Sequence, residues 1–267
     1  MVNAREILEK HRITWETLLS PLFLPNGEPL RGRFITIRSD THTPLANKFL
    51  TKDYVPAQNV EIFSLFDSVI EDLGGEFVDA GEIYGGRRVW ARARTSSKIM
   101  MDNKTTITNH VLLCTDHGGT GTILQGEVIP FWKDVALTTL VKPPKGQNHT
   151  SYSAGSPMLD TSTGFGLLAP LRNGKGLPLG FLQRVVEKTI GQGKYAGKAL
   201  GEISNTLATF PTQDPLSLWL AICYWADFEK IIRPQWTFRH SGRVQSNWFG
   251  SSRRLKARAL KTIQEAL

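Results

Sequence analysis

The sequence predicts an α+β protein: an antiparallel four-stranded sheet flanked by helices, followed by a helical C-terminal half with a basic tail. In the first half, apolar segments of strand length alternate with glycine-containing turns, which is typical of consecutive hairpins. In the second half, apolar residues recur with the period of a helix, between N-cap and proline signals. The chain has 267 residues, of which 40% are hydrophobic and 21% charged, the composition of an ordinary globular protein.

Composition divides the chain into three segments. Residues 1–150 should form the α+β sheet core together with an N-terminal helix. Residues 151–178 are rich in Gly, Pro and Ser and should form a loop. Residues 179–267 should form a helical region that ends in a basic, aromatic tail.

Two helices are expected before the sheet. Residues 3–19 carry apolar side chains at near-helical spacing, and Pro21 with the turn Pro25-Asn26-Gly27 should end this helix. Residues 59–72 should form a second amphipathic helix, which Gly74-Gly75 would end.

Two hairpins should supply the four strands. The first joins residues 76–83 and 87–95 around Tyr84-Gly85-Gly86. The second joins residues 107–114 and 120–131, with its turn at 116–119. Residues 132–140 are expected to form a helix that packs back onto the sheet.

Three helices are predicted in the C-terminal half. The first covers 179–190, and the second covers 214–232, where Asp214 is a suitable N-cap before Pro215 at the first helical position. The last should begin at Ser251 or Ser252 and run to the C-terminus, and we expect that deleting it leaves the fold largely intact.

All of the excess positive charge lies in one segment near the C-terminus. Residues 230–261 contain nine Lys or Arg and no Asp or Glu, and subtracting these nine from the 32 basic residues of the chain leaves 23 against 24 acidic ones. Four large aromatic residues are interleaved with the cations: Trp236, Phe238, Trp248 and Phe249. Cations neutralise phosphates and aromatic rings stack on bases, so this combination favours a single-stranded nucleic acid as the partner.

Two sets of residues are candidates for nucleic-acid contact. Alternation in the strand 87–95 places three arginines and an indole on one face, opposite small apolar residues; carboxylates on adjacent strands are the alternative explanation for such a face. In the last helix Arg254, Arg258 and Lys261 should form one stripe. The predicted floor of the site is Arg88, Trp90, Arg92 and Arg94, and the predicted clamp is Arg233, Trp236, Arg239, Arg243, Trp248, Arg253, Arg254, Lys256, Arg258 and Lys261.

Two other functions stay open. Asp116, His117 and His149 are the residue types of a metal-dependent hydrolase or nuclease, although their spacing matches no common metal motif. A basic tail is also compatible with an interaction protein that inhibits a host defence system by binding an acidic protein or a guide RNA. The leading interpretation needs no catalytic residue, no metal and no cofactor.

Little in the sequence points to secretion or to a membrane. The first ten residues lack the apolar core of a signal peptide, and the most apolar stretch, 216–228, is too short to span a bilayer. Cys114 and Cys223 are far apart in sequence, which argues against a disulfide framework. A cytoplasmic protein without a membrane segment is expected.

A series of short motifs resembles a known family. The series runs from Asp53-Tyr54-Val55-Pro56-Ala57-Gln58-Asn59 through Gly85-Gly86-Arg87-Arg88-Val89-Trp90 to Asp116-His117-Gly118-Gly119-Thr120, and ends at His149-Thr150. It is similar to the phage/plasmid-like protein family, a domain of unknown function, over residues 53–150. Residues 131–137 depart from the Arg and Cys-Gln-Asn run that the family usually carries there. The resemblance implies a phage or plasmid gene acting in the cytoplasm of a bacterial host, and it brings no established activity.

The expected order of elements, helix, two hairpins and helix, is similar to that of phage single-strand annealing proteins. Those proteins combine a curved antiparallel sheet with a basic groove and assemble into rings or filaments. This resemblance implies a role in annealing or recombination of single-stranded DNA, with RNA as an alternative partner, and a homo-oligomer.

Overall fold

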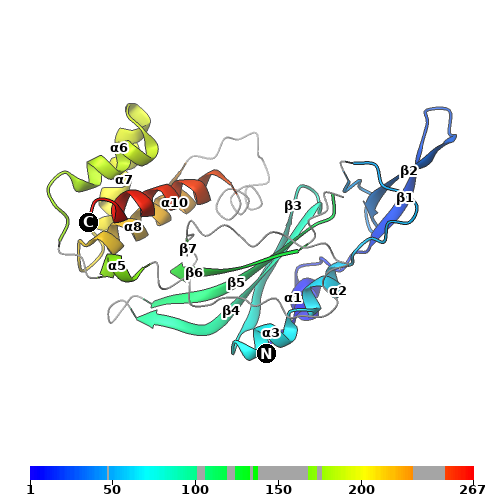
Figure 1. Ribbon diagram of the computed structural model, residues 1–267, viewed down its shortest axis with the longest axis horizontal. Coiled ribbons are helices and arrows are strands. Elements are labelled where there is room, and N and C mark those ends of the chain that lie inside the picture. Colours follow the sequence, from blue (N-terminus) through cyan, green and yellow to red (C-terminus); the bar gives the residue numbers. More distant parts are fainter. Residues whose placement is uncertain are drawn as a thin grey trace. The chain divides into compact units, whose positions relative to one another are not determined.

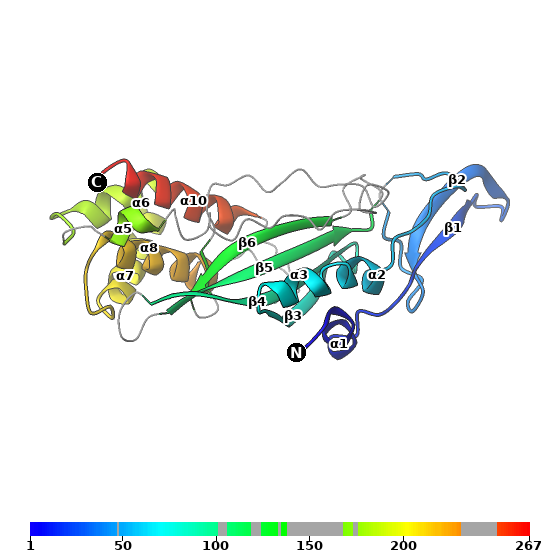
Figure 2. The same cartoon turned by 60° about the horizontal axis from the view of Figure 1, so that its bottom comes forward.

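The computed structural model describes residues 1–46, 48–100, 106–118, 124–132, 135–137, 168–172, 176–230 and 250–267. The described residues within 1–96 and 110–128 belong to one compact unit, called unit 1 below. Those within 97–109, 129–141 and 160–267 belong to a second, called unit 2. Three long strands contribute residues to both units, so no single cut in the sequence separates them (Figures 1 and 2).

The main sheet confirms the predicted class. Its strands follow chain order, β3-β4-β5-β6-β7, and the pairs β3–β4 and β6–β7 are antiparallel. The β3–β4 turn uses three consecutive residues with positive φ, Tyr84, Gly85 and Gly86, as the sequence predicted for a tight hairpin. The strands are β3 (Glu76–Ile83), β4 (Arg88–Met100), β5 (Thr106–Asp116), β6 (Leu124–Trp132) and the short β7 (Val135–Ala136).

The prediction of a helix over 132–140 is wrong for the residues of this range that the structure describes, Trp132 and 135–137. Trp132 is the last residue of β6, and β7 turns back to pair Val135 with it. The Leu137 N–H then donates to the Pro130 carbonyl at 2.7 Å. Apolar residues here satisfy their backbone groups through the sheet edge instead of through a helix.

The N-terminal helix is shorter than predicted. Helix α1 (Ala4–Lys10) begins at Asn3, whose side chain accepts from the Glu6 N–H while the Glu6 carboxylate accepts from the Asn3 N–H. The chain then leaves the helix, with φ of 58° at Arg12. Residues assigned to the helix from Thr17 onward instead form β1 (Thr17–Phe23), paired with β2 (Pro29–Arg38) in a separate two-stranded sheet.

The second predicted helix is present but broken. It forms α2 (Asn59–Ser64) and α3 (Asp67–Asp72), and Gly74, with φ of 59°, ends α3 as expected. Together with α1 these helices pack their apolar sides against β3 and its neighbours. The buried cluster of unit 1 includes Ile7, Leu8, Trp15, Phe63, Phe66, Phe77, Val89, Ala91, Ala93, Val111 and Leu113.

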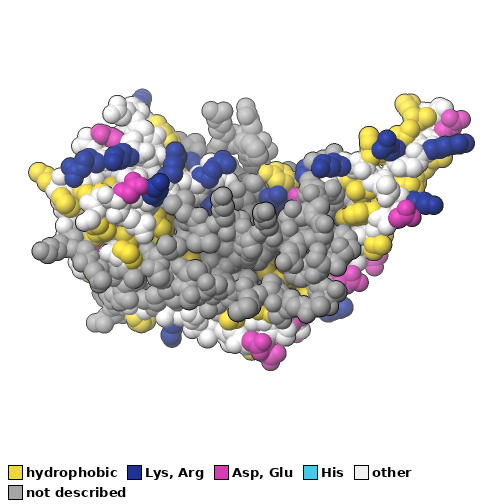
Figure 3. All heavy atoms as spheres, viewed as in Figure 1, with side chains coloured by type: hydrophobic (Ala, Val, Ile, Leu, Met, Phe, Trp, Pro, Cys, Tyr) yellow, Lys and Arg dark blue, Asp and Glu magenta, His cyan; other side chains and the backbone are white. Residues whose placement is uncertain are grey.

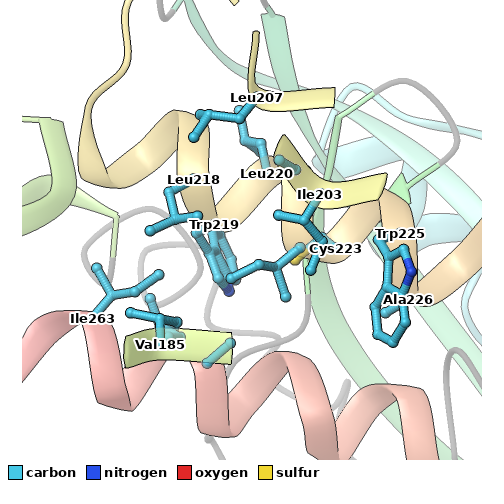
Figure 4. Close-up of a cluster of buried hydrophobic side chains, with 14 of the residues drawn as sticks. Val185, Ile203, Leu207, Leu218, Trp219, Leu220, Cys223, Trp225, Ala226 and Ile263 are labelled. Atoms are coloured by element: carbon cyan, nitrogen blue, oxygen red, sulfur yellow. The ribbon is translucent and has the colours of Figure 1, made fainter. Parts of the chain in front are cut away.

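Unit 2 is a group of helices around one apolar cluster, in which α8 is buried on every side (Figure 4). Asp214 caps α8 by accepting from the Ser217 N–H at 2.7 Å, as predicted. The deletion of residues from 251 onward would remove Leu255, Leu260 and Ile263 from this cluster, so the last helix belongs to the core and is not dispensable. The helices are α5 (Ala169–Arg172), α6 (Phe181–Ile190), α7 (Lys194–Leu207), α8 (Pro215–Tyr224), the π-helical turn η2 (Trp225–Glu229) and α10 (Ser251–Gln264).

No helix among the described residues combines the length and the apolarity that crossing a membrane requires.

Candidate functional site

The arginines of β4 face carboxylates on neighbouring strands. Arg94 contacts Glu76 at 2.6 Å and Arg92 contacts Asp79 at 3.6 Å, both across the β3–β4 pair. Arg88 reaches Asp116 of β5 at 3.4 Å. Carboxylates on adjacent strands were the alternative explanation for this arginine-rich face. Their ion pairs reduce the positive charge that the face could offer to a polyanion.

Trp90, the aromatic residue of the same face, is buried. Its side chain is 1% exposed and lies over Gly81 of β3, where an added Cβ would come within 2.5 Å of the indole. A base cannot stack on a ring in this position without a rearrangement of the sheet. The predicted floor of the site is thus formed by three ion-paired arginines and an inaccessible ring.

Helix α10 presents its cations as the sequence predicted. Arg254, Arg258 and Lys261 are exposed, while Leu255, Ala259 and Ile263 are buried on the opposite side. Lys261 contacts Glu265 at 3.6 Å, and neither Arg254 nor Arg258 has an ion-pair partner among the described residues. Figure 3 shows Lys and Arg side chains gathered over the face of unit 2 that α6 and α10 form.

Lys230 joins the arginines at the N-terminal end of α10. Its ammonium group donates to the Ser251 hydroxyl at 3.1 Å and to the Ser252 hydroxyl at 3.4 Å. Burial lowers the pKa of Lys230; the nearby charges of Arg258, Lys256 and Arg254 lower it further, and the charge of Asp227 acts against them. Three like charges therefore gather near the N-terminal end of α10, where the helix dipole also favours an anion.

Lys256 does not belong to this surface. Its side chain is 0% exposed, and its ammonium group lies 2.6 Å from the carboxylate of Asp227, which is 2% exposed. Asp227 is part of the π-helical turn η2, where the wider turn interrupts the spacing of α8. Lys256 was predicted to contact nucleic acid, but in this structure it is the partner of a buried carboxylate inside unit 2.

The remaining predicted residues divide into two groups. Arg253 lies on the first turn of α10 and is half-buried. Five members of the predicted clamp, Arg233, Trp236, Arg239, Arg243 and Trp248, lie outside the described residues, as does His149.

His117 is a structural residue in the described part of the protein. One ring nitrogen lies 2.7 Å from the Asn59 side-chain oxygen and the other 3.3 Å from the Thr17 hydroxyl, so both are occupied. The Trp15 ring packs edge-on against it, and burial lowers the pKa of His117 to about 4. A neutral imidazole thus ties the end of β5 to α2 and β1.

Asp116 is equally occupied. One of its oxygens accepts from the Gly118 N–H at 2.7 Å, and both oxygens also face arginines at or just before the start of β4. Within the described residues, no three His, Cys, Asp or Glu side chains come together to hold a metal ion. The contacts of Asp116 and His117 hold the end of β5 in place.

Sequence comparison adds one similarity. A family model described as Domain of unknown function (DUF932) matches residues 48–125. This region overlaps the motifs from Asp53 to Thr120 and covers less than a third of the chain. Searches of curated proteins and of solved structures found no match. The matched family is uncharacterised and assigns no activity to these residues.

Proposed function

We propose that the protein binds single-stranded nucleic acid, DNA or alternatively RNA, through the cations of α10 and the basic, aromatic segment before it. The observation that carries the proposal is the cluster of Lys230, Arg254 and Arg258 at the N-terminal end of α10. These cations repel one another, and Arg254 and Arg258 have no ion-pair partner among the described residues, while the buried Asp227 offsets part of the repulsion at Lys230. A row of phosphates would relieve that repulsion.

Two of the five cations of α10 lie in its first turn, where cations stabilise a helix least. The helix dipole favours anions near the N-terminus and cations near the C-terminus, yet the first turn of α10 has no acidic residue and carries Arg253 and Arg254. Helix stability does not explain this placement, whereas contact with an external polyanion does.

We propose further that binding serves annealing or recombination of single strands in a phage or plasmid context. In this role a cytoplasmic homo-oligomer holds strands side by side, and charge and stacking suffice without a cofactor. Mixing complementary oligonucleotides with and without the protein measures annealing, and sedimentation measures assembly.

Salt dependence of binding tests the proposal. The double variant Arg254→Ala/Arg258→Ala should reduce the slope of log affinity against log salt by about 1.4, since each single-strand phosphate contact contributes about 0.7. The matched control is Lys194→Ala/Lys198→Ala, which removes two exposed cations from α7 of the same unit and should leave the slope unchanged. A wild-type protein that does not bind single strands at low salt, or equal changes in both variants, would refute the proposal.

A further inference from the structure

The β1–β2 hairpin is anchored at its base and unsupported along its outer half. At the base, Arg38 bonds Asp40 and Glu82 at 2.7–2.9 Å and stacks 4.5 Å from the centre of the Trp15 ring. As far as the structure describes unit 1, its buried apolar cluster contains no residue of β1 or β2. A two-stranded hairpin without a core of its own is only marginally stable in water. Packing therefore does not explain the outer half of this hairpin, and a binding role would.

The hairpin contains a large bulge that displaces two arginines. Pro21 pairs with Phe34, but Phe23 pairs with Pro29, so the residues 30–33 of β2 stand opposite Leu22 alone. Gly32 supplies the positive φ, 67°, that such a bulge requires. Bulges re-aim side chains, and here Arg31 and Arg33 on either side of Gly32 are both exposed.

Two phenyl rings are exposed in this region, one on β1 and one next to β2. Phe23 is 60% and Phe49 62% exposed, and the Arg33 guanidinium lies 5.5 Å from the centre of the Phe49 ring. The bridge between Phe34 and Leu50 holds Phe49 next to β2. Figure 3 shows apolar side chains directly beside basic ones over this hairpin. Open aromatic faces next to cations are what a single strand uses for stacking.

Charge favours an anionic occupant. The exposed cations of this region are Arg31, Arg33, Lys48 and Lys52, and the nearest carboxylates in sequence are Glu28, at the hairpin tip, and Asp53. Addition of a strand from another protein is disfavoured, because Pro21, Pro25 and Pro29 lack the N–H groups that such pairing needs.

We propose that the outer half of the β1–β2 hairpin is a second contact surface for single-stranded nucleic acid, and this rests on the function proposed above. Phe23 and Phe49 stack on bases, and Arg31 and Arg33 contact phosphates. The surface belongs to unit 1, whereas α10 belongs to unit 2, so each is removed without touching the other.

Two double variants test the hairpin surface. Phe23→Ala/Phe49→Ala should weaken binding of a single-stranded oligonucleotide about 5- to 150-fold for each stacked base lost, with an unchanged salt slope. Arg31→Ala/Arg33→Ala should reduce the slope by about 1.4. An oligonucleotide carrying 5-iodouracil should cross-link on irradiation to a peptide that contains Phe23 or Phe49.

Controls in the same unit are Leu65→Ala, an exposed apolar residue of the α2–α3 link, and Arg5→Ala, an exposed cation of α1. Both should bind like wild type, and circular dichroism melts should show that every variant is folded. Wild-type affinity in the hairpin variants, with binding still lost in the α10 variants, overturns this inference alone. Hairpin variants that change sedimentation but keep affinity assign the surface to a second copy of the chain and also overturn it. Failure of the wild-type protein to bind single strands overturns the proposed function itself.

Discussion

Replacement of Lys256 by alanine separates a buried ion pair from a nucleic-acid contact. The substitution leaves the Asp227 carboxylate, 2% exposed, without its ammonium partner. Removing one member of a buried pair costs about 3–5 kcal/mol, because the other charge stays desolvated and uncompensated. For a chain of this size each kcal/mol lowers Tm by about 2–4 °C, so Tm should fall by about 6–20 °C.

Thermal and urea denaturation followed by circular dichroism measure this loss. Lys261→Ala is the control on the same helix: its side chain is 63% exposed, and its pair with Glu265 should contribute less than about 1 kcal/mol. The double variant Asp227→Leu/Lys256→Met removes both charges and should recover most of the stability that Lys256→Ala loses. If Lys256→Ala melts like wild type and loses affinity for single strands, the ion pair is not structural and Lys256 returns to the binding surface.

Three further outcomes are expected. Stability should fall as pH drops from about 6.5 towards 4, because His117 stays neutral when folded, with its pKa lowered by burial to about 4, while the unfolded chain takes up the proton; the shift corresponds to at most about 3 kcal/mol, and the urea midpoint of His117→Gln should depend less on pH over this range. Cys114 and Cys223 should not react with a thiol reagent until the protein is denatured, since both are buried and burial raises the pKa of Cys114 to about 12; rapid labelling of the native protein would contradict their burial. Trp248→Ala should weaken single-strand binding by about 1–3 kcal/mol without altering the salt slope, whereas Arg254→Ala should reduce the slope by about 0.7; a large fall in Tm for Trp248→Ala would place that ring in a core instead.

Local signals in the sequence were sufficient for several elements. The turn at Tyr84-Gly85-Gly86, the N-cap at Asp214 and the start of α10 at Ser251 depend on interactions between residues close in the chain, and all are confirmed. Local signals failed where they conflicted. Glycines at four positions of 191–201 obscured α7. The apolar spacing of residues 3–19 predicted one helix, but its last three residues, 17–19, pair with β2 instead.

The position of the excess positive charge could also be predicted, because residue counts alone locate the basic segment 230–261. The stripe of Arg254, Arg258 and Lys261 followed from helical periodicity and is exposed as predicted. Periodicity could not show that Lys256, on the same helix, meets Asp227, since that contact depends on the packing of η2 against α10. Nor could it show that Asp79 and Glu76 would face the arginines of β4, which is decided by strand register.

What the sequence by itself determined is the class of fold, the position of the charge and the helix that bears it, because these depend on composition and on spacing along the chain. The tertiary structure alone decided which cations are free to meet a partner. Packing buries Lys256 and Trp90, places Arg88, Arg92 and Arg94 beside carboxylates, and leaves Arg254 and Arg258 exposed. The physical reason is that the charge a partner meets depends on burial and on carboxylates brought near by packing, and neither is encoded in the spacing of residues along one element.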